Sequence, residues 1–195
     1  MILRSWQQKI IDDFPSIIKQ NKRFILKAPT GAGKTILASE IVERFYKDKK
    51  ILVLCHRLVL LEQLERALSK RHKVRKLSLS ESGPAFNEYD ILLSTNMRAK
   101  EVLEEAIRLA DLIIVDEAHR VSPNGAGYKK ILEDFENYGK PDAQFMGLTA
   151  SPERRTGDQR DQLNLAFDAI IDCADIETLI EEGILVPPIY RPHFV

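Results

Sequence analysis

The segment Ala-Pro-Thr-Gly-Ala-Gly-Lys-Thr at residues 28–35 constrains the fold of this chain more than any other stretch. It follows the apolar run Arg-Phe-Ile-Leu-Lys at residues 23–27 and precedes apolar residues at helical spacing. Gly31 and Gly33 leave the backbone open to an anion, because a Cβ at either position would obstruct its approach. A strand, a glycine-rich turn and a helix in this order predict a phosphate-binding loop, called the phosphate loop below.

The residue types in the phosphate loop suit a triphosphate and a metal ion. Lys34 places a positive charge on the β- and γ-phosphates, and Thr35 offers a hydroxyl to Mg²⁺. The positive end of the following helix favours the same anion. The alternative is a plain glycine turn, but the strand before and the helix after favour phosphate binding. The predicted nucleotide-binding residues of the loop are Thr30, Gly31, Ala32, Gly33, Lys34 and Thr35.

The length and composition of the chain are those of one ordinary globular domain. It has 195 residues, of which 44% are hydrophobic and 30% charged, and its formal net charge is zero. No apolar run is long enough to cross a bilayer, and the start lacks a signal-peptide pattern, so we expect a cytoplasmic protein without a membrane partner. Cys55 and Cys173 lack metal-ligand spacing, and we expect both to be buried apolar residues.

Apolar runs and helical patterns alternate along the chain. This alternation predicts an α/β fold with a mostly parallel sheet and helices on both faces. Pro15 is expected to start a second short helix. The expected strands are residues 23–27, 51–55, 74–79, 91–94, 112–115 and 144–148, and the expected helices lie near residues 3–20, 34–46, 56–69, 98–109, 128–138 and 177–182.

Polar side chains follow several of these strands at the point where each strand ends. In parallel α/β sheets the site lies beyond the carboxyl ends of the strands. We therefore expect these residues to share one edge of the sheet: Thr30, His56, Arg57, Ser94, Thr95, Asp116, Glu117, Thr149 and Ser151.

Asp116, Glu117 and His119 follow the buried run at residues 112–115 and form what we call the acidic turn, residues 116–119. A carboxylate at the end of a buried strand is costly unless it binds a cation. We expect Asp116 to hold Mg²⁺, Glu117 to orient and deprotonate the attacking water, and His119 to sense the γ-phosphate. The alternative is an acidic residue that complements a helix dipole. The phosphate loop upstream favours the metal site.

Three segments together resemble motifs I, II and III of the superfamily 2 helicases, the DEAD/DEAH-box type of ATPase: residues 28–35, 116–119 and 148–152. Their order and spacing match as well. The resemblance implies the N-terminal RecA-like domain of such a helicase, a P-loop NTPase that uses ATP and Mg²⁺. It also implies that Thr149 and Ser151 couple the nucleotide state to the grip on a nucleic acid.

Further segments resemble other motifs of the same superfamily. Residues 3–7 look like an adenine-reading segment, which implies that Gln7 bonds the adenine edge and Arg4 stacks on its face. Residues 54–57 with 61–63 resemble motif Ia, and residues 93–95 resemble motif Ib. The implied contacts to the sugar-phosphate backbone come from Arg57, Ser94, Thr95 and Asn96. Alternatively, the hydroxyls at 94 and 95 only cap the next helix.

The residues after motif III narrow the resemblance. Residues 151–157 with 167–168 are similar to the branch of restriction-enzyme motor subunits and RadD-like DNA helicases. We expect residues 1–182 to be the ATP-binding domain and residues 183–195 to begin the connection to a second RecA-like domain that lies outside this chain. The family's arginine fingers lie on that second domain, so we expect the isolated domain to be nearly inactive.

The sequence thus predicts the ATP-binding half of an ATP-dependent DNA helicase or translocase. An RNA helicase and a restriction-complex motor subunit remain open, because they carry the same motifs. A P-loop kinase or switch-type binding module is a further alternative of a different class. A kinase needs an arginine-bearing lid over the phosphates, whereas Arg154 and Arg155 follow the Thr-Ala-Ser-Pro turn. We expect DNA rather than RNA as the partner.

Overall fold

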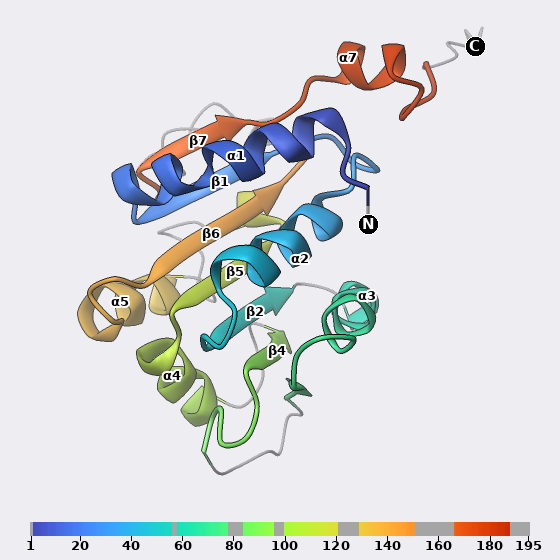
Figure 1. The fold of residues 1–195 in the computed structure, drawn as a ribbon. Coiled ribbons are helices and arrows are strands. Elements are labelled where there is room, and N and C mark those ends of the chain that lie inside the picture. Colours follow the sequence, from blue (N-terminus) through green and yellow to red (C-terminus); the bar gives the residue numbers. More distant parts are fainter. Residues whose placement is uncertain are drawn as a thin grey trace, which may run out of the picture.

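The computed structural model describes residues 2–55, 58–77, 84–95, 100–120, 129–150 and 166–187. They form a seven-stranded sheet with the strand order β3-β4-β2-β5-β6-β1-β7 (Figure 1). Its strands are β1 (Arg23–Lys27), β2 (Ile51–Cys55), β3 (Val74–Lys76), β4 (Ile91–Thr95), β5 (Leu112–Asp116), β6 (Gln144–Thr149) and β7 (Ala169–Asp172). The helices are α1 (Ser5–Gln20), α2 (Lys34–Phe45), α3 (Leu58–Leu68), α4 (Lys100–Leu109), α5 (Lys129–Tyr138) and α7 (Ile176–Glu181), with a 3₁₀ turn η1 (Ala118–Arg120).

All strand pairings between the described strands are parallel, as the sequence predicted. Successive side chains of a strand point to opposite faces, so Leu26 packs in one core layer and Ile25 in the other. Helices α1, α2 and α3 cover the first layer, and α4 and α5 cover the second. In Figure 1, α1 and α2 cross the near face of the sheet. This is the α/β fold with helices on both faces.

The register places the two predicted chemical segments at one edge. Leu148 of β6 pairs with Leu26 of β1 on one side and with Asp116 of β5 on the other. The phosphate loop leaves β1 just beyond this row, and the acidic turn leaves β5 at the row itself. Because β6 alone separates the two strands, both segments emerge at the carboxyl edge about 10 Å apart, as two strand spacings require.

The prediction that Pro15 starts a new helix is wrong. Helix α1 continues through Pro15, and its N-cap is Arg4. Phe14 is fully buried against Phe24, with ring centroids 5.9 Å apart, and against Phe45, at 4.8 Å. We attribute the unbroken helix to this packing, which offsets the hydrogen bond that a proline inside a helix removes.

Strand β7 was not predicted. It adds to the edge of β1, with Ile25 opposite Ile170, and its side chains are only partly buried. A short, half-exposed strand lacks the continuous apolar run by which the other strands were recognised. Helix α7 follows it and ends before Gly183, which has a φ of +68° as expected of a helix-terminating glycine.

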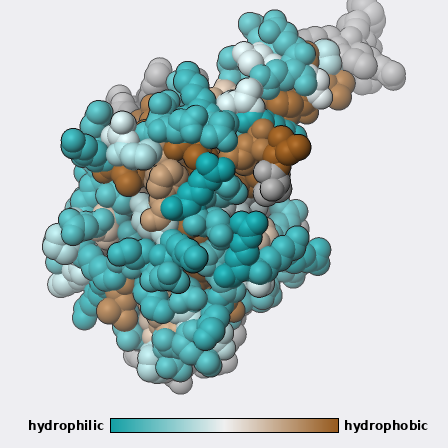
Figure 2. All heavy atoms as spheres, in the orientation of Figure 1, coloured by the Kyte–Doolittle hydropathy of each residue, from teal (hydrophilic) through white to brown (hydrophobic). Residues whose placement is uncertain are grey.

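Cys55 and Cys173 are both buried free thiols, which confirms that they are part of the packed interior. None of the described helices combines the length and apolar character that crossing a membrane would require. Figure 2 shows a largely hydrophilic surface on this side of the molecule. Hydrophobic residues gather on it just below α7, which lies at the top of the view.

Candidate nucleotide-binding site

The phosphate loop has the backbone conformation that its glycines predict. Gly31 has a φ of +81° and Gly33 a φ of +104°, a region that side chains with a Cβ rarely adopt. A Cβ on Gly33 would also lie 2.9 Å from Gln7 Nε2. Gly33 is the N-cap of α2, so the first free N–H groups of this helix belong to the loop.

Lys34 is held at the mouth of the loop by the loop's own carbonyls. Its Nζ donates to Ala28 O at 2.9 Å and to Pro29 O at 3.1 Å. Burial lowers the pKa of Lys34, while the negative charges of Glu117 and Asp116 oppose this shift. The structure therefore brings the ammonium of the phosphate loop and both carboxylates of the acidic turn into one electrostatic neighbourhood.

Asp116 is a carboxylate that lacks enough positive charge around it. Burial and the neighbouring charge of Glu117 raise its pKa, and the charge of Lys34 only partly offsets this. Oxygen ligands with excess negative charge are what Mg²⁺ binds in proteins. Asp116 and the hydroxyl of Thr35, in the first turn of α2, are thus chemically suited to such an ion.

Glu117 lies in a strained backbone position between β5 and η1. Its φ is +55°, in the left-handed region that costs a non-glycine residue about 1 kcal/mol or more. Its Oε2 lies 3.1 Å from His119 Nδ1. The same His119 nitrogen lies 3.1 Å from Thr149 Oγ1. The acidic turn is therefore in contact with the end of β6.

Thr149 connects this contact to the phosphate loop. It is fully buried, and its backbone oxygen accepts a hydrogen bond from Ala28 N at 3.0 Å. Its hydroxyl meets His119 on the other side. One residue at the end of β6 thus touches both segments, which is the geometry that a coupling residue needs. Ser151, the other predicted coupling residue, lies outside the described residues.

Arg4 and Gln7 hold the phosphate loop in place. The Gln7 side chain is 1% exposed; its Oε1 accepts from Arg4 N, and its Nε2 donates to Gly33 O, both at 3.0 Å. The Arg4 guanidinium donates to the carbonyls of Gly31 and Ala32. The sequence suggested only adenine recognition for these two residues, which stays a prediction. Their bonds to the loop were missed because they join segments that are remote along the chain.

The predicted nucleic-acid residues that the structure describes lie farther along the same edge. Ser94 and Thr95 end β4, which is four strand positions from β1, or roughly 19 Å at the usual spacing. Ser94 is fully buried, and its hydroxyl donates to Thr95 O at 2.9 Å. Arg57 and Asn96 lie outside the described residues. The nucleotide and nucleic-acid candidates are therefore separate regions of one edge.

Two concave regions border the phosphate loop. A cavity of about 670 Å³ opens beside β1 and β7, and its lining includes Lys27, Pro29 and Asp172. Lys27 Nζ and Asp172 Oδ1 form an ion pair at 2.6 Å there. Cys173 also lines it, and burial raises the pKa of this thiol to about 12, so the thiol is uncharged at neutral pH.

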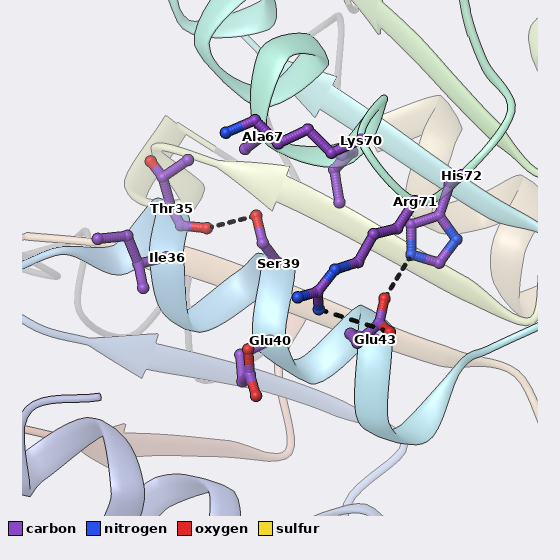
Figure 3. Close-up of a pocket in the computed structure, with 10 residues that line it drawn as sticks. Thr35, Ile36, Ser39, Glu40, Glu43, Ala67, Lys70, Arg71 and His72 are labelled. Carbon is purple, nitrogen blue, oxygen red and sulfur yellow. Dashed lines mark hydrogen bonds and ion pairs between the residues drawn. The ribbon is translucent and has the colours of Figure 1, made fainter. Parts of the chain in front are cut away.

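The second region is a groove of about 310 Å³ between α2 and the end of α3 (Figure 3). It shares only Thr35 with the phosphate loop. Glu43 of α2 pairs in it with Arg71 at 3.5 Å and with His72 at 3.3 Å. These contacts join α2 to the segment between α3 and β3, so Arg71 and His72 have an intramolecular role.

The phosphate loop, the acidic turn and the threonine between them lie at one edge of a parallel sheet. This combination defines the N-terminal RecA-like domain of a superfamily 2 helicase. The chain belongs to the family described as "Type III restriction enzyme, res subunit", whose model matches residues 1–154.

Individual relatives agree with this placement. The mouse (Mus musculus) "ATP-dependent RNA helicase DHX58" is 30% identical over 201 residues, which cover 91% of this chain and 29% of the relative. "Putative helicase 22" of the Sulfolobus islandicus filamentous virus (isolate Iceland/Hveragerdi) is 28% identical over 198 residues, covering 95% of this chain and 34% of the relative. This chain thus spans only about a third of these relatives.

The fold also resembles solved structures. One is a nuclease-deletion mutant of the Type ISP restriction-modification enzyme LlaGI in complex with a DNA substrate mimic. It has a TM-score of 0.69 and 21% sequence identity, and the match covers 94% of this chain and 21% of that chain. At this identity the likeness shows the shared fold.

Proposed function

We propose that this chain is the ATP-binding half of an ATP-dependent DNA helicase or translocase. The observation that carries the proposal is the strand register, in which Leu148 lies between Leu26 and Asp116, so that the phosphate loop and the acidic turn leave the sheet at the same edge. The charges of Glu117 and Asp116 act on the pKa of Lys34, in agreement with this register. A glycine turn without a nucleotide would have no use for two carboxylates and a half-buried ammonium at the same edge.

In this proposal each residue has a separate role. The loop amides and Lys34 bind the triphosphate, while Thr35 and Asp116 bind Mg²⁺. When bound, the ion neutralises charge on the phosphate oxygens. Glu117 orients and deprotonates the attacking water. Its contact with His119 gives the carboxylate a defined orientation.

The connection to a second domain is part of the proposal. Residues 183–195 would begin it, and Leu185 in this segment approaches the phosphate loop, since a Cβ built on Gly31 would lie 3.4 Å from Leu185 Cδ2. A helicase moves by closure of two domains. One domain therefore supplies binding sites but cannot make the closing motion by itself. We expect ATP hydrolysis near background by this chain alone.

ATP binding is the first test. We expect the wild-type chain to bind MgATP and Lys34→Ala to lose at least about tenfold in affinity, because one charge-assisted contact to phosphate is removed. Lys47→Ala is the matched control, since Lys47 is exposed after α2, away from the phosphate loop. Isothermal titration with MgATP measures both. Equal affinities of wild type and Lys34→Ala would defeat the proposal.

The second test asks whether the chain binds DNA or RNA more tightly. The LlaGI structure contains a DNA substrate mimic, which supports DNA, whereas the mouse relative is named an RNA helicase and supports the alternative. Fluorescence anisotropy with single-stranded DNA and RNA of one sequence, competing at one salt concentration, separates the two. We expect DNA to bind more tightly. Tighter binding of RNA would replace the DNA proposal by the RNA one.

A further inference from the structure

Gly147 lies in β6, directly beneath the acidic turn. A Cβ built on it would lie 2.6 Å from Ala118 Cβ, 3.0 Å from Ile25 Cγ1 and 3.3 Å from Phe167 Cε1. Carbon atoms in favourable contact are about 3.5–4.0 Å apart. The methyl group of Ala118 therefore occupies the space that any side chain at position 147 would need.

Gly147 and Thr149 face the same side of the sheet, because they are two residues apart on one strand. Gly147 meets Ala118, and Thr149 meets His119 at 3.1 Å. Two consecutive residues of η1 thus contact alternate residues of β6. The turn runs along the strand, and its height above the strand is limited at one point by a glycine.

We propose that Gly147 is a positioning residue, whose missing side chain sets the height of the acidic turn above β6 and thereby the places of Glu117 and His119. This inference rests on the proposed function of those two residues. An isolated glycine within a strand often marks such a close approach of another backbone.

The size of the effect follows from the distances. Ala118 is fully buried, and its methyl group has no torsion by which it could turn aside. Restoring ordinary carbon contact from 2.6 Å requires a shift of about 1 Å in the backbone of the turn. A 3.1 Å contact between His119 and Thr149 does not survive such a shift as a hydrogen bond. A misplacement of about 1 Å is also enough to cost a catalytic group about a hundredfold in rate.

The experiment compares Gly147→Ala with the double variant Gly147→Ala/Ala118→Gly. The double variant adds one methyl group and removes the one that it would approach most closely, at 2.6 Å, while the longer approaches to Ile25 and Phe167 remain. Ile107→Val is the control for general loosening, because Ile107 is buried in the same core layer on α4. Two quantities are measured on the whole chain: the ¹⁵N resonances of the His119 ring without nucleotide, and the ratio of the dissociation constants of ADP and adenylyl imidodiphosphate with Mg²⁺.

We expect Gly147→Ala to shift the His119 resonances and to lower the affinity ratio by about tenfold, with ADP affinity nearly unchanged. The double variant should restore both quantities, and Ile107→Val should change neither. Wild-type resonances and ratio in folded Gly147→Ala would overturn the inference. If Gly147→Ala does not fold, the double variant tests the inference. A double variant that also fails to fold would overturn the inference. A wild-type chain that binds no nucleotide defeats the proposed function, whereas the His119 resonances still test the position of the turn.

Discussion

His119 Nδ1 lies 3.1 Å from Thr149 Oγ1, so the acidic turn after β5 touches the last residue of β6. The backbone oxygen of the same threonine accepts from Ala28 N, where the phosphate loop begins. Because Thr149 is buried and contacts both the acidic turn and the phosphate loop, a displacement of either segment would also displace Thr149. This geometry supports the proposed role of Thr149 in passing the nucleotide state to the nucleic-acid region.

Thr149→Val tests this role, because valine keeps the shape of threonine but lacks the hydroxyl. We expect the free energy of unfolding to fall by about 1 kcal/mol, the usual net worth of one hydrogen bond. ATP affinity should change by no more than about twofold. The effect of a nucleotide analogue on the affinity for single-stranded DNA, measured by anisotropy, should disappear. Thr149→Ser keeps the hydroxyl and should keep the nucleotide response of the wild type, although the loss of a buried methyl group lowers its stability by about 1 kcal/mol. An unchanged nucleotide response in the valine variant would contradict the coupling.

Gln7→Ala separates two roles of the buried amide. The variant loses the bonds to Arg4 N and Gly33 O, so we expect the free energy of unfolding to fall by about 1–3 kcal/mol. If Gln7 mainly holds the phosphate loop, the affinities for ATP and GTP should fall by the same factor. If it also reads adenine, the ATP affinity should fall further. Calorimetric titration with both nucleotides measures the difference, with the exposed Gln20→Ala as the control.

Asp116→Asn should stabilise the chain while it abolishes the effect of Mg²⁺ on ATP affinity. The pKa of Asp116 is raised above 3.8, mainly by burial, so the folded state holds this proton more tightly than the unfolded state. Wild-type stability relative to the variant should therefore fall as the pH rises from 3.8 through the folded-state pKa. Urea denaturation of both proteins across this range measures the difference. A stability difference that does not grow with pH would contradict the assigned burial of the carboxylate.

Glu43→Gln tests the groove between α2 and α3. Glu43 forms an ion pair with the exposed Arg71 and lies 3.3 Å from His72 Nε2, so the loss of these contacts should lower the free energy of unfolding by less than about 1 kcal/mol. We expect MgATP affinity to stay at the wild-type value, because Glu43 lies about two turns along α2 from Thr35, the last residue of the phosphate loop. Thermal unfolding and calorimetric titration measure the two effects. A large loss of ATP affinity would mean that this groove, and not the carboxyl edge alone, takes part in nucleotide binding.

The sequence by itself determined the buried strands, the phosphate loop and the acidic turn. Each of these depends on residues that are close along the chain, such as the run at residues 112–115 followed by Asp116. Continuous apolar runs in the sequence predict buried parallel strands. Their carboxyl ends were then expected to share an edge, which the pairing of Asp116 with Leu148 bears out.

Only the tertiary structure decided what lies around these segments. Three contacts join parts of the chain that are far apart in sequence. They are the hydrogen bond of Gln7 to the phosphate loop, the contact of His119 with Thr149, and the packing of Ala118 over Gly147. Local patterns state which face of a strand is buried, but they do not state which strand is its neighbour. The order of the strands determines these partners, and the close packing of the interior leaves no freedom to exchange them.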